Sequence, residues 1–191
     1  MAGCTGSDPI VTETPVPSAS GSAEPQPSAT PSVSVSVSPS VAALSDEELL
    51  EILPAGAEFP DVEGAVVTAQ FFSVLLGEIF KSGDTTVWEA LATDACDYCG
   101  SQVEAIEKFR DSGRTARGGS VALDETKTRG ALGDDGFAYV RTDVQIADLF
   151  ASSAGQPEEN VEPEAHVQLD LQMLLVGEVW KVNGVQAETL P

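Results

Sequence analysis

The second half of the chain alternates apolar and polar side chains over long segments, which restricts it to β-strands. Over residues 165–175, every second position is apolar: Ala165, Val167, Leu169, Leu171, Met173 and Leu175. Because successive side chains of a strand point to opposite faces of a sheet, this pattern predicts a long strand with one buried face. Residues 118–128 and 137–147 predict two earlier strands, and residues 148–163 predict a polar loop. A last strand is expected to contain Val179, Trp180, Val182 and Val185.

The segment before these strands has the apolar spacing of helices. Residues 61–81 carry one apolar stripe that includes Ala65, Ala69, Phe72, Leu76 and Ile79. A short second helix is expected around Trp88, and a third after the capping box Ser101-Gln102-Val103-Glu104. Helices followed by strands predict an α+β fold, in which three N-terminal helices pack on a curved antiparallel sheet of about four strands.

Composition divides the chain near residue 45. Residues 5–45 contain 11 Ser, 7 Pro and 4 Thr, with no Lys, Arg or aromatic residue. A segment with so few large apolar groups cannot offset its ordering entropy, so we expect a disordered tether. The capping box Ser45-Asp46-Glu47-Glu48 then predicts the start of folded structure. Residues 46–191 are sufficient for a single α+β domain.

The first four residues, Met1-Ala2-Gly3-Cys4, match the end of a bacterial lipobox. In that chemistry the Cys thiol takes a diacylglycerol and becomes the new N-terminus after the signal peptide is cleaved. The signal peptide itself does not precede the match. We therefore expect residues 1–4 to be a lipobox remnant and Cys4 to be lipidated, which predicts an extracytoplasmic protein anchored to the cell membrane. The alternative is a cytosolic protein with an incidental cysteine.

The charge of the chain excludes one class of partner. Its 31 Asp and Glu outnumber its 9 Lys and Arg, so the net charge of −22 opposes binding to nucleic acid. No uninterrupted run of about 18 apolar residues occurs, so no membrane-spanning helix is expected. Six of the nine basic residues lie close together in the sequence: Lys108, Arg110, Arg114, Arg117, Lys127 and Arg129. They form a candidate surface for an envelope protein or an anionic wall polymer. The alternative is that they are ordinary charges at a helix end and on strands.

The two remaining cysteines, Cys96 and Cys99, are expected to form a short disulfide. If Cys4 carries lipid, these two restore an even count, and an oxidising compartment favours their pairing. A redox-active pair, unpaired thiols and a metal site remain alternatives. One histidine and two cysteines are too few ligands for zinc, so neither a metal nor a cofactor is expected. That histidine, His166, falls by alternation on the polar face of its strand, and no catalytic residue is assigned.

The predicted order is three helices followed by a long curved meander, whose last strand contains Trp180-Lys181-Val182-Asn183-Gly184. Over residues 58–190 this order resembles the nuclear-transport-factor-2-like (NTF2-like) cone. More narrowly, the chain resembles an uncharacterised lipoprotein family of actinobacteria. The shared features are the anchored Cys, the tether, Ser82-Gly83-Asp84, Cys96-Asp97-Tyr98-Cys99 and Val179-Trp180-Lys181-Val182. That family has no assigned activity, so the resemblance implies no catalytic residues.

Together these patterns predict a non-catalytic cell-envelope lipoprotein whose extracytoplasmic domain binds or scaffolds an unknown partner. The second hypothesis is a small-molecule enzyme that uses the cone as its pocket. The third is a thiol-disulfide protein that acts through Cys96 and Cys99. The oligomeric state is left open.

Overall fold

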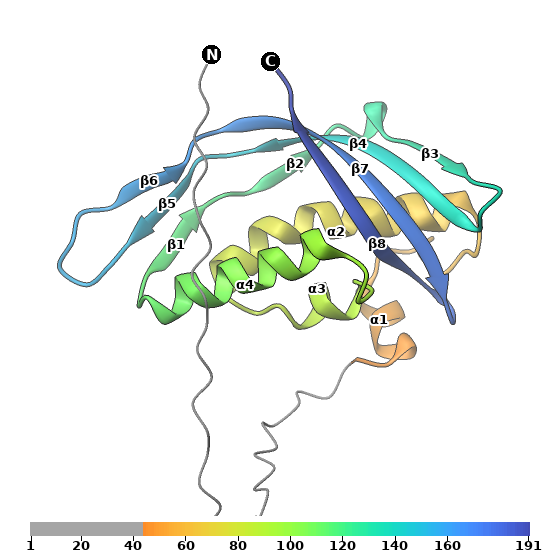
Figure 1. Ribbon diagram of the computed structural model, residues 1–191, viewed down its shortest axis with the longest axis horizontal. Helices are drawn as coiled ribbons and strands as arrows, with labels where there is room; N and C mark the ends of the chain where they lie inside the picture. Colours follow the sequence, from red (N-terminus) through yellow and green to blue (C-terminus); the bar gives the residue numbers. More distant parts are fainter. Residues whose placement is uncertain (1–43) are drawn as a thin grey trace, which may run out of the picture. The chain divides into compact units, whose positions relative to one another are not determined.

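The computed structural model describes residues 44–191. The predicted lipidation site Cys4, the lipobox remnant 1–4 and residues 5–43 of the predicted tether lie outside the described residues. Within the described part, helices come first and strands afterwards, and the helices lie on one side of antiparallel sheets (Figure 1). The predicted α+β class is confirmed.

The described residues form four α-helices, one more than predicted: α1 (Asp46–Ile52), α2 (Val62–Ser82), α3 (Thr86–Ala90) and α4 (Asp97–Asp111). The additional helix is α1, which has seven residues and is too short for an apolar period to emerge. Its start does follow the predicted capping box. The Glu48 N–H donates to Ser45 Oγ at 3.3 Å, and the Ser45 N–H donates to the Glu48 carboxylate at 2.8 Å.

Local capping also explains where the two long helices begin. Asp61 caps α2 by accepting a hydrogen bond from the Glu63 N–H at 2.9 Å. The prediction that the third helix follows Ser101 is wrong, because this helix, α4, begins at Asp97 with Cys96 as its N-cap. The Cys96 sulfur accepts a hydrogen bond from the Cys99 N–H at 3.2 Å, whereas Ser101 lies inside the helix and donates to the Tyr98 carbonyl oxygen.

The sheets are larger than the predicted four strands. The five-stranded sheet has the order β2 (Val121–Leu123), β4 (Phe137–Ile146), β7 (Ala165–Val176) and β8 (Val179–Thr189), with β3 (Arg129–Leu132) also paired to β4. The three-stranded sheet has the order β1 (Thr115–Gly118), β5 (Leu149–Ser152) and β6 (Glu159–Glu162). All strand pairs within these sheets are antiparallel.

Two predicted segments differ from the structure. In place of the strand expected over 118–128, only the short strand β2 forms. Gly118 and Gly119 before it adopt positive φ, and a short 3-10 helix, η1 (Glu125–Lys127), follows it. The loop expected over 148–163 instead contains β5 and β6. Leu149 and Ala151 alternate as buried residues in β5, but the exposed polar residues that follow conceal this pattern in the sequence.

The core lies between the inward face of the five-stranded sheet and α2. Leu171 and Met173 of β7 are buried on that face, while His166 is exposed on the other, as the alternation predicts. Trp88 of α3 stacks on Phe72 of α2 with the ring centroids 3.8 Å apart. Both tryptophans are therefore interior residues, since Trp180 is also buried.

The apolar composition of α2 follows from this position. Among the described residues, α2 alone is long and apolar enough to cross a bilayer, although its apolar residues form no uninterrupted run. Its buried residues, which include Ala65, Ala69, Phe72 and Ile79, pack within the domain core. A core helix of a folded domain accounts for that composition.

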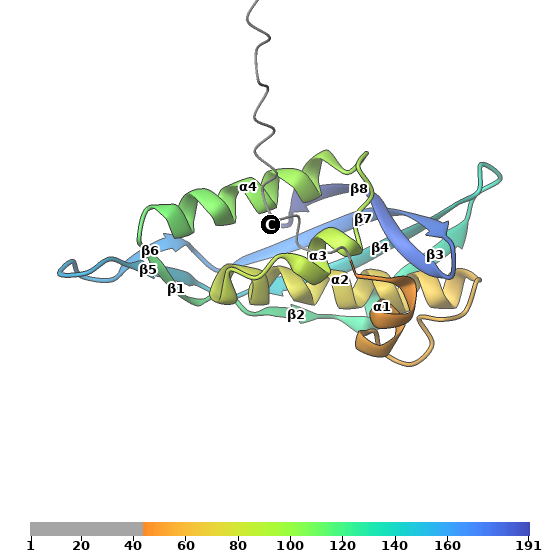
Figure 2. The same cartoon turned by 90° about the horizontal axis from the view of Figure 1, so that it is seen from below.

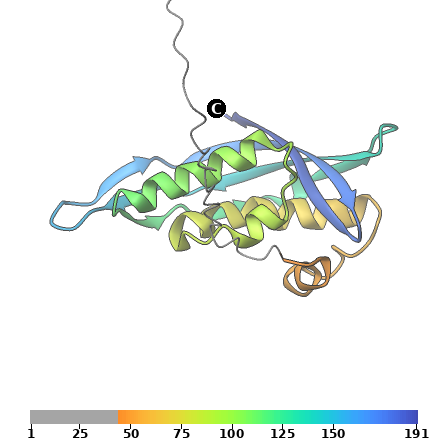
Figure 3. The ribbon, with the colours of Figure 1, turned by 60° about the horizontal axis from the view of Figure 1, so that its bottom comes forward.

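The remaining helices extend this layer. α3 lies between α2 and α4, and α4 runs beside the edge strand β8 (Figure 2). The β5–β6 hairpin projects at the end of the domain where α4 ends (Figure 3). At the other end, α1 lies near the turn between β7 and β8, where the Glu178 N–H donates to Asp46 at 3.4 Å.

Candidate ligand-binding site

A pocket of 220 Å³ opens between the sheets, α2 and the start of α4. Most of its lining is apolar and comes from elements far apart in the sequence, including Leu76 and Phe80 of α2, Val144 and Ile146 of β4, and Val167 and Leu169 of β7. Ligand pockets for drug-sized molecules usually enclose about 300–1,000 Å³. This pocket therefore suits a small molecule or one end of a longer apolar group.

Tyr98 of α4 is one of the polar residues that line this pocket, together with Gln102 of α4 and Glu162 of β6. Burial raises the pKa of the Tyr98 hydroxyl, and the nearby negative charge of Glu162 raises this pKa further. The phenol is therefore neutral at physiological pH and can donate a hydrogen bond. Within residues 44–191, this hydroxyl has no hydrogen-bond partner. By contrast, Ser73 in the pocket wall already donates to the Ala69 carbonyl oxygen at 2.8 Å.

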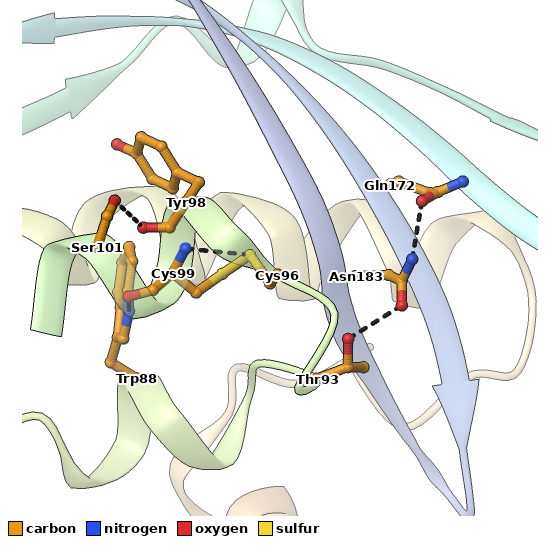
Figure 4. Close-up of a disulfide and its surroundings, with 8 residues drawn as sticks. All are labelled: Trp88, Thr93, Cys96, Tyr98, Cys99, Ser101, Gln172 and Asn183. Atoms are coloured by element: carbon orange, nitrogen blue, oxygen red, sulfur yellow. Dashed lines mark hydrogen bonds between the residues drawn. A yellow bond between two sulfur atoms is a disulfide. The ribbon is translucent and has the colours of Figure 1, made fainter. Parts of the chain in front are cut away.

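A disulfide between Cys96 and Cys99 holds the turn that carries Tyr98, with the two Cα atoms 5.2 Å apart (Figure 4). The indole N–H of Trp88 donates to the Cys99 carbonyl oxygen at 3.2 Å, so the turn is also tied to α3. Figure 4 shows the Tyr98 ring on the opposite side of this turn from Trp88. Cys96 and Cys99 are 3% and 2% exposed, a burial that opposes attack by an external thiolate.

Replacing both cysteines, as Cys96→Ala/Cys99→Ala, is expected to lower the free energy of unfolding by less than about 3 kcal/mol. The reason is that the closed loop is much shorter than the 15-residue loop for which the chain-entropy model gives that value. Urea denaturation measures the difference. Ser101→Ala, on the same turn of α4, is the control and should change stability by about 0.5 kcal/mol or less. An unfolded double variant would contradict the expectation, and rapid turnover by the oxidised protein in a disulfide-reductase assay would favour a redox role.

The structure divides the six predicted basic residues between two places. One end of the domain, where α4 ends and β1 begins, carries Lys108, Arg110, Arg114 and Arg117 (Figure 1). Lys127 belongs to η1 and Arg129 to β3, and both elements lie towards the other end. They do not form one continuous surface. A partner that uses either group remains a prediction.

Most of these basic side chains have carboxylate partners. Arg117 makes two hydrogen bonds to Glu158, at 2.9 and 2.6 Å, which lower the pKa of that carboxyl group. Lys127 lies 3.4 Å from Asp143, and Arg114 lies 3.4 Å from Glu159. Arg129 instead donates to the carbonyl oxygens of residues 126 and 128. A polyanion would have to compete with these internal partners.

Within residues 44–191, no group of three His, Cys, Asp or Glu side chains is arranged to hold a metal ion. The pocket residues Tyr98 and Glu162 were not identified as a site from the sequence. In the sequence, Tyr98 stands out only as part of the motif Cys96-Asp97-Tyr98-Cys99, and Glu162 lies in a segment that predicts a loop. No local pattern links these two residues, because β6 and α4 meet only in the folded domain.

Comparison with known proteins yields structural likenesses alone. No protein-family model matches the chain, and no curated protein matches it. The intermembrane-space region of the chloroplast protein ARC6 is 9% identical, with a TM-score of 0.48 over 69% of this chain and 98% of that chain. CagV of Helicobacter pylori strain 26695, a VirB8 homolog of the T4SS, is 12% identical, with a TM-score of 0.42 over 66% of this chain and 99% of that chain.

A third similar structure, a chain named for NTF2, is 10% identical, with a TM-score of 0.39 over 63% of this chain and 96% of that chain. All three TM-scores are below 0.5, so the α+β class rests on the helices and strands of the structure itself and not on these likenesses. At these identities the likeness concerns the fold alone, so no ligand or activity is transferred from these proteins.

Proposed function

We propose that this chain is a cell-envelope lipoprotein whose domain binds a small, largely apolar ligand without converting it. The observation that carries the proposal is the 220 Å³ pocket, whose lining is mainly apolar and whose polar side chains, which include Gln102 and Glu162, are joined by the neutral phenol of Tyr98. A ligand with an apolar body and one hydrogen-bond acceptor would match this lining. Such a ligand would bury its apolar surface and satisfy the Tyr98 hydroxyl.

The chemistry of the pocket supports binding over catalysis. A general acid or base works best with a pKa near the working pH. The pKa of Tyr98 is shifted upward from its ordinary value, away from neutrality. His166, the only histidine, lies on the outward sheet face and does not line this pocket.

The second candidate function is an enzyme that uses the same pocket. It is favoured by the proximity of two ionisable groups, Tyr98 and Glu162, to one apolar cavity. Turnover of a ligand that Tyr98→Phe abolishes, while the ligand still binds, would establish this candidate in place of the first.

Filling the pocket tests the binding proposal directly. The probe is 2-heptanone, which has an apolar chain and one carbonyl acceptor, titrated into the full chain and followed by NMR chemical shifts. Ala187→Phe places a ring at the pocket wall from β8 and should abolish the shifts around Tyr98. Tyr98→Phe should weaken binding by about tenfold, as expected for one lost hydrogen bond.

Ala154→Phe introduces the same side chain at an exposed turn between β5 and β6, and this control should bind the probe like the wild type. Melting temperatures of all variants show whether the fold is intact. Equal binding by a folded Ala187→Phe variant would overturn the pocket assignment.

The anchoring part of the proposal is supported by Met1-Ala2-Gly3-Cys4, by the Ser- and Pro-rich segment that follows and by the resemblance to an actinobacterial lipoprotein family. Cys4→Ala, made in a full-length gene with its signal peptide, should move the protein from the membrane to the soluble fraction. The reason is that two acyl chains give stable anchoring, and an alanine has no thiol to which they can be attached. Cys4→Ala protein that remained in the membrane fraction would contradict lipid anchoring, and unlipidated wild-type protein in mass spectra would do the same.

A further inference from the structure

The outward face of the five-stranded sheet carries an open trough of 830 Å³. Its floor is formed by four segments in register, residues 129–131, 139–141, 170–172 and 184–186, on β3, β4, β7 and β8. The start of α4 borders the trough at the β8 edge, where Tyr98 lies between it and the apolar pocket. The volume falls in the usual range for ligand sites.

The charges of the trough cancel, although the chain as a whole is strongly acidic. Arg129 and Arg141 are matched in number by Asp97 and Asp170. Arg141 and Asp170 form a bidentate ion pair, in which two guanidinium nitrogens donate to the two carboxylate oxygens at 2.6 and 3.0 Å. Because positive and negative side chains are equal in number, the trough does not attract a polyanion or a polycation, and its surface is complementary to a neutral ligand.

An exposed aromatic ring lies in the trough in a fixed orientation. Tyr139 is 43% exposed, and its hydroxyl donates to Asp135 at 2.5 Å and accepts from the Gln172 amide at 3.3 Å. Gln172 in turn accepts from Asn183, which accepts from Thr93, both at 2.9 Å (Figure 4). This chain of hydrogen bonds orients the ring and the amide before any ligand arrives, which lowers the entropy cost of binding.

Gly184 leaves the floor open beside Gln172. Its backbone does not require glycine, because its φ is outside the left-handed region, and an added Cβ would meet nothing nearer than the Gln172 Oε1 at 3.8 Å. Gly130, on the same floor, differs: an added Cβ there would lie 2.5 Å from a Val66 methyl group of α2. Close packing against α2 explains why residue 130 is a glycine, but no such contact explains the glycine at position 184. A glycine inside a strand weakens that strand, and at this position its missing side chain keeps the trough empty.

We propose that this trough binds a neutral oligosaccharide. A sugar ring has an apolar C–H face that packs on an exposed aromatic ring, and its hydroxyl groups both donate and accept hydrogen bonds. Tyr139 provides the ring, and the Gln172 and Gln186 amides and the Arg141–Asp170 pair provide planar donors and acceptors at the same surface. The site is on the opposite side of the sheet from the apolar pocket and does not depend on the proposed function of that pocket.

The test uses the full chain and a panel of neutral hexasaccharides (cellohexaose, mannohexaose and chitohexaose), with hyaluronan as an anionic control. Isothermal titration calorimetry should detect binding of at least one neutral sugar and none of hyaluronan. Gly184→Val fills the floor and should weaken that binding at least tenfold while the melting temperature is maintained or raised. Tyr139→Ala should weaken it by a similar factor, and Tyr139→Phe, which keeps the ring, should weaken it less.

Gln145→Val is the matched control, because it is exposed on the same face of β4 outside the trough and should leave the affinity within twofold of the wild type. Three results would overturn the proposal: no neutral sugar bound with a Kd below 1 mM, unchanged binding by Gly184→Val, or binding of hyaluronan alone. Sedimentation that showed a dimer disrupted by Gly184→Val would also overturn it, by assigning the face to a second copy of the chain.

Discussion

Leu171→Ala is expected to lower the free energy of unfolding by about 2–5 kcal/mol, the range for truncation of a buried leucine. Leu171 is 2% exposed and lies in β7, which is flanked on both sides by paired strands, β4 and β8. Neighbouring strands hold the backbone in place, so the surroundings can collapse only partly onto the cavity. Chemical denaturation monitored by tryptophan fluorescence provides the measurement, since Trp88 and Trp180 are both buried.

His166→Ala, on the same strand, is the control for this substitution. His166 is exposed on the outward face, so its truncation should change stability by about 0.5 kcal/mol or less. Comparable losses from the two substitutions would show that the faces of β7 are assigned wrongly. Loss of ligand binding or turnover in a folded His166→Ala variant would instead indicate a functional histidine and favour the enzyme hypothesis.

Gly77→Ala is expected to destabilise the domain by about 1–3 kcal/mol, the usual cost of overpacking a core. An alanine methyl group at this position of α2 would overlap the carbonyl oxygen of Gly119 and lie 3.3 Å from the Ser120 Cα. Both neighbours are backbone atoms of the link between β1 and β2, so no side chain can rotate away to make room. Thermal and urea denaturation measure the loss.

Gly100→Ala makes the same chemical change in α4, with the opposite expected sign. Gly100 is exposed, and an added Cβ would have no heavy atom within 4 Å. Alanine should therefore stabilise the helix by about 0.5–1 kcal/mol, the usual difference between the two residues in a helix. Stabilisation by both substitutions would mean that α2 does not approach the β1–β2 link as closely as described.

The long elements could be predicted from the sequence because their signals are periodic and repeated many times. The alternation over 165–175 identified β7 and its buried face, and the apolar stripe over 61–81 identified α2. Short elements have few repeats of a period, so the sequence does not reveal α1 as a helix and predicts a loop where β5 and β6 form. The start that the sequence predicts for α4 is too late, because the Cys96 sulfur has the capping role that the sequence pattern gives to Ser101.

The candidate sites depend on contacts that local sequence does not encode. Tyr98 and Glu162 meet at one pocket, although 64 positions separate them in the chain. Arg141 and Asp170 face each other because of the register between β4 and β7, and a shift of one residue would move each side chain to the other face of its strand. The trough and the pocket could be described only once that register was known.

The sequence by itself determined the class of fold, the start of α1, the extent of α2 and the buried face of β7. These features arise from interactions within one turn of helix or from side-chain periods along one strand, and both are readable in a short window. Only the tertiary structure decided which glycine must remain small, where Tyr98 lies and which polar groups share a surface. These features depend on distances between elements that are remote in the chain, and packing and strand register set those distances.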